Sequence, residues 1–431
     1  MRRLRLIPWI LVLLAARIAF AESPALAKRI EQILADPQVA HAMWGVEAVS
    51  LSSGQKIYSL NADKLFAPAS NTKLFTTAAA LALIGPDYRF RTTVEANSVV
   101  DKRGRLAGDL ILVGRGDPNL SSRVLPYRLH TQRTDPPGGI HALDELADQL
   151  VQKGLKYVDG DVVADDSYYV FERYGEGWTQ DDLMWEWGAP VSALTINDNV
   201  LFVNILPADR PGEHAFVNIS PYAEYYRLDN RIVTTPAGTG PRKIFINREP
   251  GSSEVAMWGT IPADDNGANE QLAIDDPAEF AAHLFRSMLE KRGIVVYGRA
   301  RAHHGEATSF PTFTITVPAA ERGGETVPLP PVSSPAPENF PLVLASYESQ
   351  PVRDDIRVVN KVSQNLHAEM LLRLLGKQKG TAGTIESGLD VVSGFLAQAG
   401  VPRDEYAFYD GSGLSRENLV TPGAIVKLLR Y

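Results

Sequence analysis

Hydrophobic and polar residues alternate near the start of the chain and then recur at a helical spacing. Two alternating runs, 44–51 and 57–60, flank Ser52-Ser53-Gly54, and this pattern predicts a β-hairpin. After the hairpin, apolar residues recur every three or four positions until Gly85-Pro86 ends the run: Leu74, Phe75, Ala78, Leu81 and Ala82. We therefore expect a hairpin followed by a helix whose first turn contains Ser70.

The same patterns divide the chain into two parts. Residues 22–90 combine a helix, the hairpin and the next helix, and they look like the front half of a domain that residues 340–431 complete. Residues 91–339 are predicted to be inserted, and they contain strands such as 110–113 and two helices that each lead into a strand. Five prolines between positions 327 and 337 predict an extended connector back to the first domain.

Composition places the chain among folded proteins. It has 431 residues, of which 45% are hydrophobic and 22% charged, and these values favour two or three domains. Residues 1–21 combine basic residues, an apolar run over 6–16 and Ala19-Phe20-Ala21, which together predict a cleaved secretory signal peptide. An uncleaved anchor is the weaker alternative, because Arg17 interrupts the run well short of the ~20 residues that span a bilayer. We expect a secreted, periplasmic protein with no transmembrane segment after cleavage.

Charge and cysteine content exclude several classes of function. Removal of residues 1–21 takes away four of the 43 basic residues and no acidic one, so 39 basic residues face 51 acidic ones, a net charge of −12. This balance disfavours nucleic-acid binding. The absence of cysteine excludes disulfides, a thiol nucleophile, cysteine-bound zinc and a lipid-modified N-terminal cysteine. The eight histidines show neither His-x-x-x-His nor Glu-x-x-His spacing, so we expect no metal.

The tetrapeptide from Ser70 to Lys73 carries the first candidate chemistry. One helical turn separates the two residues, so Ser70 Oγ and Lys73 Nζ can meet on one face of the helix. Burial near a helix N-terminus lowers the pKa of an ammonium group, which would let Lys73 take the serine proton at neutral pH. The same pattern at Ser53 and Lys56 falls in the predicted hairpin turn, where solvated turn residues are the expected interpretation.

A second candidate motif, Ser363-Gln364-Asn365, precedes another predicted helix with apolar positions at Leu366, Ala368, Met370, Leu371, Leu374 and Leu375. A hydroxyl beside an amide offers one group to relay a proton and another to hold a lysine or a substrate carbonyl. The other Ser-x-Asn copy, at Ser59 and Asn61, closes the early hairpin and has no such setting. The later segment 410–416 is rich in turn residues, and a tight surface loop is its simplest interpretation.

Taken together, these residues resemble the penicillin-recognising serine peptidases, and specifically the class C low-molecular-mass penicillin-binding proteins, the D-alanyl-D-alanine carboxypeptidase/endopeptidase family. The resemblance rests on residues 67–73, on 362–366 with Ala368-Glu369 after them, and on 410–416. Lys73 and Ser363 are 290 positions apart, and a long insertion between these motifs marks this family. The resemblance implies an α+β fold: a β-lactamase/transpeptidase-like domain, with an antiparallel sheet flanked by helices, that carries large inserted α/β-type domains.

The resemblance also implies a mechanism on peptidoglycan stem peptides. Ser70 attacks the carbonyl between two D-alanines, and Lys73 takes its proton. Ser363 relays a proton to the leaving amine, while Asn365 positions Lys73 and the substrate carbonyl. An acyl-enzyme forms on Ser70, and β-lactams acylate the same serine. No cofactor is implied, and the sequence does not indicate an oligomeric state.

The inserted segment 177–194 contains three of the six tryptophans, at positions 178, 185 and 187. By its place in this segment, Asp182 matches an acidic residue that in the family lies near the active-site mouth and can meet the cationic end of the peptide stem. A packed aromatic loop with solvent-facing acids is the alternative interpretation.

The third motif of the family is missing from the sequence. Lys-Thr-Gly on an edge strand supplies a cation for the substrate's terminal carboxylate, and the adjoining strand gives an oxyanion-hole N–H. No Lys-Thr-Gly, Lys-Ser-Gly or His-Thr-Gly occurs, so we expect a C-terminally truncated chain with little activity of its own. Two alternatives stay open: an inactive remnant that only binds the cell wall, and a serine β-lactamase, which the long insertion disfavours.

Overall fold

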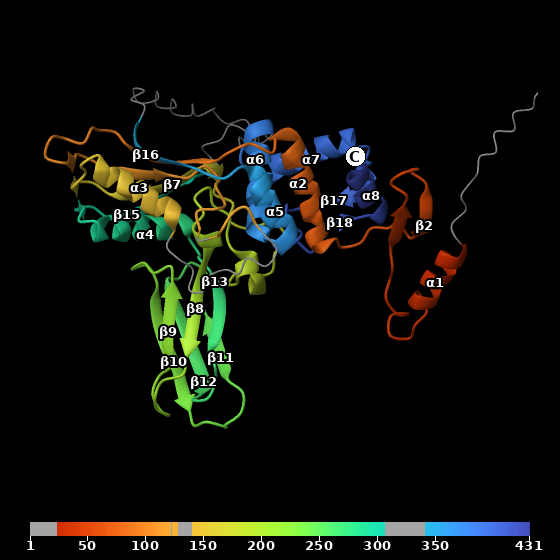
Figure 1. Ribbon diagram of the computed structural model, residues 1–431, viewed down its shortest axis with the longest axis horizontal. Helices are drawn as coiled ribbons and strands as arrows, with labels where there is room; N and C mark the ends of the chain where they lie inside the picture. Colours follow the sequence, from red (N-terminus) through yellow and green to blue (C-terminus); the bar gives the residue numbers. More distant parts are fainter. Residues whose placement is uncertain (1–23, 122, 128–139, 307–340) are drawn as a thin grey trace, which may run out of the picture.

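The computed structural model describes residues 24–121, 123–127, 140–306 and 341–431 (Figure 1). The predicted signal peptide and the proline-rich connector lie outside these residues. Within the described ranges, no helix is long and apolar enough to cross a membrane.

Five helices pack together in one part of the molecule. In Figure 1 they lie to the right of the sheet that carries the labels β7 and β15. They are α2 (Thr72–Leu83), α5 (Val352–Val362), α6 (Asn365–Lys379), α7 (Ile385–Gln398) and α8 (Pro422–Arg430). Helix α6 is buried on every side from Leu366 to Gly376, so it forms the centre of this layer. Phe75 of α2 packs in the same core as Leu371 of α6 and Phe395 of α7. The helix predicted after Ser363 is therefore confirmed. The helix predicted to hold Ser70 in its first turn is also present, but it begins at Thr72, and Ser70 lies in the 3₁₀ turn that precedes it.

The early hairpin is also confirmed. It follows helix α1 (Pro24–Leu34) and pairs β1 (Val46–Val49) with β2 (Lys56–Leu60) in antiparallel fashion. Helix α8 packs against β1. The short strands β17 (Tyr406–Ala407) and β18 (Leu419–Val420) pair nearby, and Phe66 bridges to Val420. These contacts bring residues 46–66 together with residues 406–430 beside the helical core.

A five-stranded mixed sheet forms the base of the inserted region. Its order is β15 (Ala300–Gly305), β7 (Val162–Val170), β5 (Leu110–Val113), β3 (Arg91–Ala96) and β16 (Leu342–Glu348). Strands β5, β7 and β15 run parallel, while β3 is antiparallel to β5 and β16. Helices α3 (His141–Gln152) and α4 (Pro277–Lys291) pack on this sheet and on each other. Three short parallel strands form a separate sheet, in the order β14 (Val295–Val296), β6 (Tyr157–Val158) and β4 (Arg105–Leu106).

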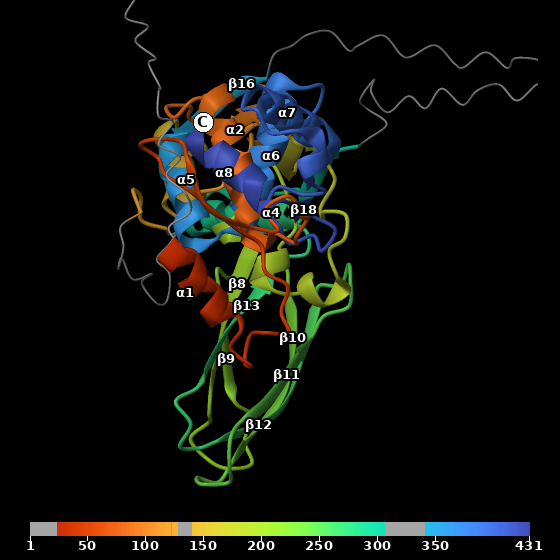
Figure 2. The same ribbon diagram turned by 90° about the vertical axis from the view of Figure 1, so that its right-hand side faces the viewer.

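A second inserted part forms an elongated β arm that projects away from the helices (Figure 2). One sheet contains β13 (Ala268–Ala273), β8 (Val200–Leu206) and β9 (Phe216–Ser220), all antiparallel. The other contains β10 (Arg227–Thr235), β12 (Glu254–Pro262) and β11 (Lys243–Asn247), with β10 and β12 parallel. The core of the arm includes Val203, Ile232 and Met257. The structure therefore matches the expected α+β class with a large insertion.

The pairing of strand β16 bears on where the chain leaves the inserted region, which the sequence pattern placed at residue 340. This strand pairs with β3 along six register positions, so residues 342–348 belong to the inserted sheet. We propose that the chain returns to the helical domain after Glu348 and not at residue 340. The sequence pattern could not distinguish these boundaries, because strand pairing is a non-local property.

Candidate active site

Ser70 and Lys73 lie at the beginning of α2. A single 3₁₀ turn, η1 (Ala69–Asn71), leads into the helix, and Ala69 adopts a left-handed φ of 47°. Ser70 is exposed, whereas Lys73 is only 2% exposed. Their Oγ and Nζ atoms are 3.2 Å apart, as helical spacing predicts. In the other copy, Lys56 instead pairs with Glu47 at 3.1 Å in the exposed hairpin.

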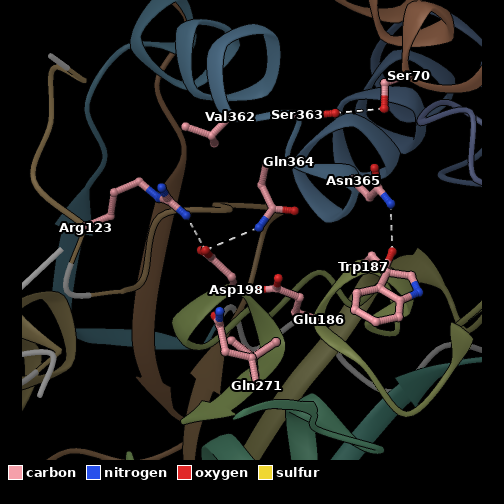
Figure 3. Close-up of a pocket in the computed structure, with 11 residues that line it drawn as sticks. Ser70, Arg123, Glu186, Trp187, Asp198, Gln271, Val362, Ser363, Gln364 and Asn365 are labelled. Atoms are coloured by element: carbon pink, nitrogen blue, oxygen red, sulfur yellow. Dashed lines mark hydrogen bonds and ion pairs between the residues drawn. The ribbon is translucent and has the colours of Figure 1, made fainter. Parts of the chain in front are cut away.

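The Ser363 motif, which lies far along the sequence, approaches Ser70 in the folded chain (Figure 3). Helix α5 ends at Val362, and the next residue, Ser363, has a φ of 60° that turns the chain sharply into α6. Ser363 Oγ donates to Ser70 Oγ at 2.7 Å. Asn365 Oδ1 accepts from Lys73 Nζ at 2.6 Å, and Asn365 Nδ2 donates to the Trp187 carbonyl at 2.8 Å. The fold therefore brings together the four residues that the sequence indicated.

The third contact of Lys73 is the Ser412 carbonyl, 2.7 Å from Nζ. The Asn365 and Ser412 oxygens can only accept, so each takes one N–H of the lysine. A neutral amine has two N–H groups and one lone pair. With both N–H groups engaged, the lone pair is left facing the Ser70 hydroxyl. This arrangement suits a base that removes the proton of Ser70.

A buried carboxylate holds the segment that supplies the Ser412 carbonyl. Asp410 is 0% exposed and accepts four hydrogen bonds of 2.6–3.0 Å, from Gly413 N, Ser415 N, Asn418 Nδ2 and Trp178 Nε1. Gly413 has a φ of +84°, and a Cβ there would lie 1.8 Å from the Ala69 carbonyl, so only glycine fits. The segment 410–416 is therefore built into the site, and it is not the surface loop that its composition suggested.

Glu369 fixes the same segment from α6. Its Oε1 accepts from Gly411 N at 2.9 Å and from Ser412 N at 2.8 Å, while Oε2 pairs with Arg373 Nη1 at 3.0 Å. Both side chains of this pair are 0% exposed. The resemblance included Glu369 but gave it no role. Its contacts show that it orients the backbone that holds Lys73.

Burial lowers the pKa of Lys73 from 10.5 to about 8, against the opposing effect of the Glu369 and Asp410 carboxylates. Since the neutral form grows as pH rises, we expect the rate of Ser70 acylation to increase with pH through about 8. Labelling by a fluorescent penicillin under pseudo-first-order conditions between pH 6 and 8.5 measures this rate. A flat profile over that range would contradict a lysine base.

A polar pocket of about 430 Å³ opens beside Ser70. Residues from three elements of the helical part and from the insertion line it: Ser70, Arg123, Glu186, Trp187, Asp198, Val200, Gln271, Val362, Ser363, Gln364 and Asn365. Asp182 is not among them. It caps the 3₁₀ turn η2 (Gln180–Asp182), where Oδ2 accepts from Thr179, and its Oδ1 accepts from Trp187 Nε1 at 3.0 Å.

The electrostatics of Asp182 agree with this position. Burial raises the pKa of Asp182, but hydrogen bonds from Thr179 and Trp187 outweigh that effect and leave the pKa below its ordinary value. Trp187 in turn stacks on Trp185 with ring centroids 5.9 Å apart. Asp182 thus holds an aromatic wall of the pocket.

No metal centre accompanies the site in the part of the chain that the structure describes. There, no group of three or more histidine, cysteine, aspartate or glutamate side chains could hold a metal ion. The side chains that surround Ser70 offer hydroxyl, amine and amide groups.

Comparisons with known proteins identify the family of the chain and agree with its fold. The model of the D-Ala-D-Ala carboxypeptidase 3 (S13) family matches residues 26–308 and 323–431. The D-alanyl-D-alanine carboxypeptidase of Actinomadura sp. (strain R39) is 34% identical over 430 residues, covering 97% of this chain and 71% of the relative. The D-alanyl-D-alanine carboxypeptidase DacB of Haemophilus influenzae is 23% identical over 388 residues, which cover 90% of this chain and 70% of that relative.

The solved structure of penicillin-binding protein 4 (dacB) from Haemophilus influenzae matches with a TM-score of 0.69 at 23% identity, covering 90% of this chain and 74% of that one. A second structure of that protein, complexed with a novel β-lactam, matches with a TM-score of 0.64 at 22% identity, covering 90% and 73%. The fold is therefore that of a penicillin-binding protein. The family match and the 34% identical relative show that the chain belongs to the D-Ala-D-Ala carboxypeptidase 3 (S13) family.

Proposed function

We propose that this protein is a serine D-alanyl-D-alanine carboxypeptidase and endopeptidase that acts on peptidoglycan stem peptides through an acyl-enzyme on Ser70. Membership of the family supports the reaction. One observation supports the residues: Ser70 Oγ lies 3.2 Å from Lys73 Nζ and 2.7 Å from Ser363 Oγ. This is the arrangement of an activated serine nucleophile with two groups that can move its proton.

The proposed reaction has two halves. Ser70 Oγ attacks the carbonyl between the two terminal D-alanines as Lys73 Nζ takes its proton. The C–N bond then breaks, and the proton passes from Lys73 through Ser363 to the amine of the departing D-alanine. Water attacks the resulting ester, and Lys73 takes the water proton before returning it to Ser70. In endopeptidase action, the leaving group is the side-chain amine of a second, cross-linked stem.

The supporting residues have proposed roles as well. Asn365 and the Ser412 carbonyl keep the lone pair of Lys73 directed at Ser70. Asp182 acts on the substrate through Trp187, whose carbonyl orients Asn365 and whose ring lines the pocket. Peptidoglycan lies outside the cytoplasm, and the pattern of residues 1–21 supports a periplasmic location.

We expect a fluorescent penicillin to label Ser70, because a β-lactam presents its carbonyl to the nucleophile as the substrate does. Digestion of the labelled full-length protein and mass spectrometry of the modified peptide locate the label. Ser70→Ala should abolish labelling, and Ser53→Ala, in the exposed copy of the motif, should not change it. A label on Ser53 would overturn the assignment. Loss of the label from wild-type protein within seconds would favour a serine β-lactamase.

A further inference from the structure

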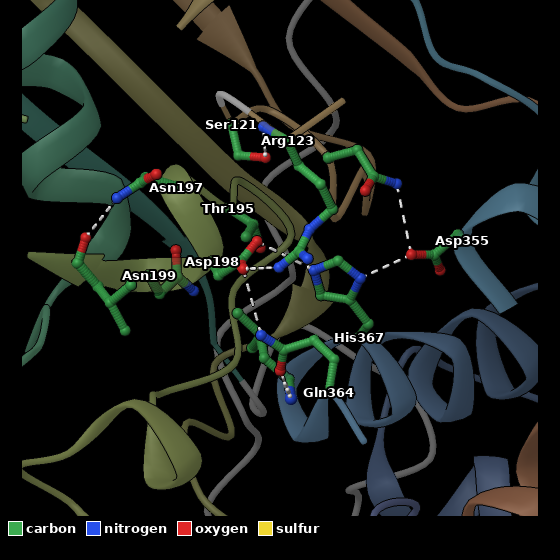
Figure 4. A network of polar contacts seen from close by, with 12 residues as sticks. Ser121, Arg123, Thr195, Asn197, Asp198, Asn199, Asp355, Gln364 and His367 are labelled. Atoms are coloured by element: carbon green, nitrogen blue, oxygen red, sulfur yellow. Dashed lines mark hydrogen bonds and ion pairs between the residues drawn. The ribbon is translucent and has the colours of Figure 1, made fainter. Parts of the chain in front are cut away.

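A buried ionic network lies directly behind the Ser363 motif (Figure 4). His367 of α6 is fully buried, and its two ring nitrogens contact two carboxylates. Nδ1 lies 2.6 Å from Asp355 Oδ1 on α5, and Nε2 lies 3.2 Å from Asp198 Oδ1. Asp198 also pairs with Arg123. His367 therefore ties the helix before the Ser363 turn to the helix after it, and both to the inserted region.

Gln364 connects this network to the turn itself. Its Oε1 accepts from Leu366 N at 2.9 Å and so caps α6, while Nε2 donates to Asp198 Oδ2 at 3.3 Å. The neighbouring Ser363 has φ 60° and ψ 37°, a left-handed conformation that costs energy for any residue except glycine. Such a conformation persists only where its surroundings hold it. On either side of this turn, Asp198 accepts a hydrogen bond from Gln364, and His367 of α6 contacts Asp355 of α5.

Asp198 and its two neighbours in the inserted region adopt left-handed conformations. Asn197, Asp198 and Asn199 have φ values of 53°, 59° and 54°. Their neighbours are held by side-chain hydrogen bonds: Asn199 Oδ1 accepts from Ile196 N at 2.9 Å, and Asn197 Nδ2 donates to the Val200 carbonyl at 2.8 Å. Three consecutive left-handed residues raise the conformational energy of the backbone. This conformation places the Asp198 carboxylate against His367 and Gln364.

The charges of the network favour a protonated His367. Burial lowers the pKa of His367, but the carboxylates of Asp355 and Asp198 outweigh it and raise the pKa to about 9. Besides these two carboxylates, the groups that face the network are Arg123 and the buried Asp117, both from the segment after β5. The ion pairs are therefore present below about pH 9 and are lost as the pH rises through that value.

We propose that Asp198 and His367 are positioning residues, which hold the Ser363 turn so that the Ser363 hydroxyl stays on Ser70. The proposal rests on the function proposed above. It also gives the inserted region a role in the chemistry. Asp198 and Arg123 belong to this region, and they help to place the Ser363 hydroxyl, which lies more than 150 positions further along the sequence. Displacement of a reacting group by about 1 Å can cost 10²-fold in rate.

The test compares three variants of the longest natural form of the protein: Asp198→Asn, His367→Gln and Gln364→Ala. The control is Asp276→Asn in a similar triad, where His304 lies 2.9 Å from Asp166 and 3.2 Å from Asp276 but does not reach the active site. We measure the rate of fluorescent penicillin acylation, and kcat and KM for D-alanine release from a synthetic D-alanyl-D-alanine peptide, with thermal unfolding for each protein.

We expect Asp198→Asn and His367→Gln to lower the acylation rate and kcat by about 10- to 100-fold with KM nearly unchanged, and Asp276→Asn to stay within about twofold. Gln364→Ala leaves the buried ion pairs intact, so it should lower the acylation rate while the protein stays folded. In wild-type protein, the acylation rate should decline above about pH 9, where His367 loses its proton. In Asp198→Asn this decline should begin at lower pH, because the loss of one carboxylate lowers the pKa of His367.

The outcomes separate the two proposals. Wild-type protein that is not acylated would overturn both. Acylation at equal rates in wild type, Asp198→Asn and Gln364→Ala would overturn the positioning role alone. If Asp198→Asn does not fold, the Gln364→Ala result decides, since Gln364 is partly exposed and lies outside the buried pairs.

Discussion

Replacement of Lys73 by arginine is expected to slow the acylation of Ser70 by about 10²- to 10⁴-fold, the usual contribution of a general base. Arginine keeps a positive charge because its pKa lies above 12, so it has no lone pair to offer the serine. The three oxygens 2.6–3.2 Å from Nζ can still accept hydrogen bonds from a guanidinium group, so the fold should survive. Fluorescent penicillin labelling gives the rate, and circular dichroism with thermal unfolding checks the fold.

Lys56→Arg is the matched control, since Lys56 occupies the same place in the exposed copy of the motif. It should be acylated at the wild-type rate. An acylation rate for Lys73→Arg within tenfold of wild type would show that Lys73 is not the base.

Local parts of the fold and site were predictable because local physics determines them. Helical geometry alone puts Ser70 and Lys73 on one face, and the structure has them 3.2 Å apart. The hairpin, α2 and α6 follow in the same way from the period of their apolar residues. Ser363 and Asn365 were indicated by their motif, but their approach to Ser70 across 293 positions depends on the packing of α6 against α2.

The groups that hold Lys73 could not be read from the sequence in this way. The Ser412 carbonyl is a backbone atom, so no side-chain pattern indicates it. Asp410 sits in a turn-rich segment that composition assigns to the surface, yet its buried carboxylate accepts hydrogen bonds from five donors. One signal was available: Glu369 and Arg373, at positions i and i+4 in an apolar helix, are spaced as a pair that could be buried together.

The β arm and the network behind Ser363 were missed for a related reason. The parallel pairing of β10 with β12 and the return of β16 to β3 join segments that are distant in sequence. Asp198 and His367 are likewise 169 positions apart. A single sequence shows propensity and period, whereas these contacts depend on the tertiary fold.

Glu369→Gln is expected to destabilise the helical domain by about 3–5 kcal/mol, the cost of leaving one member of a buried ion pair without its partner. Glu369 and Arg373 are both fully buried, so Arg373 would keep its charge with no water to solvate it. The glutamine oxygen can still accept from Gly411 and Ser412, so the loss should come chiefly from the unpaired arginine. Urea and thermal unfolding of wild-type and variant protein measure the difference.

Two further variants make the measurement specific. Glu290→Gln breaks the partly exposed Arg286–Glu290 pair, which has the same spacing on α4, and should cost at most about 1 kcal/mol. The double variant Glu369→Gln with Arg373→Met removes the unpaired charge and should regain much of the lost stability. If the single variant unfolded like wild type, or if the double variant were less stable than the single one, the cost would not come from an unpaired Arg373.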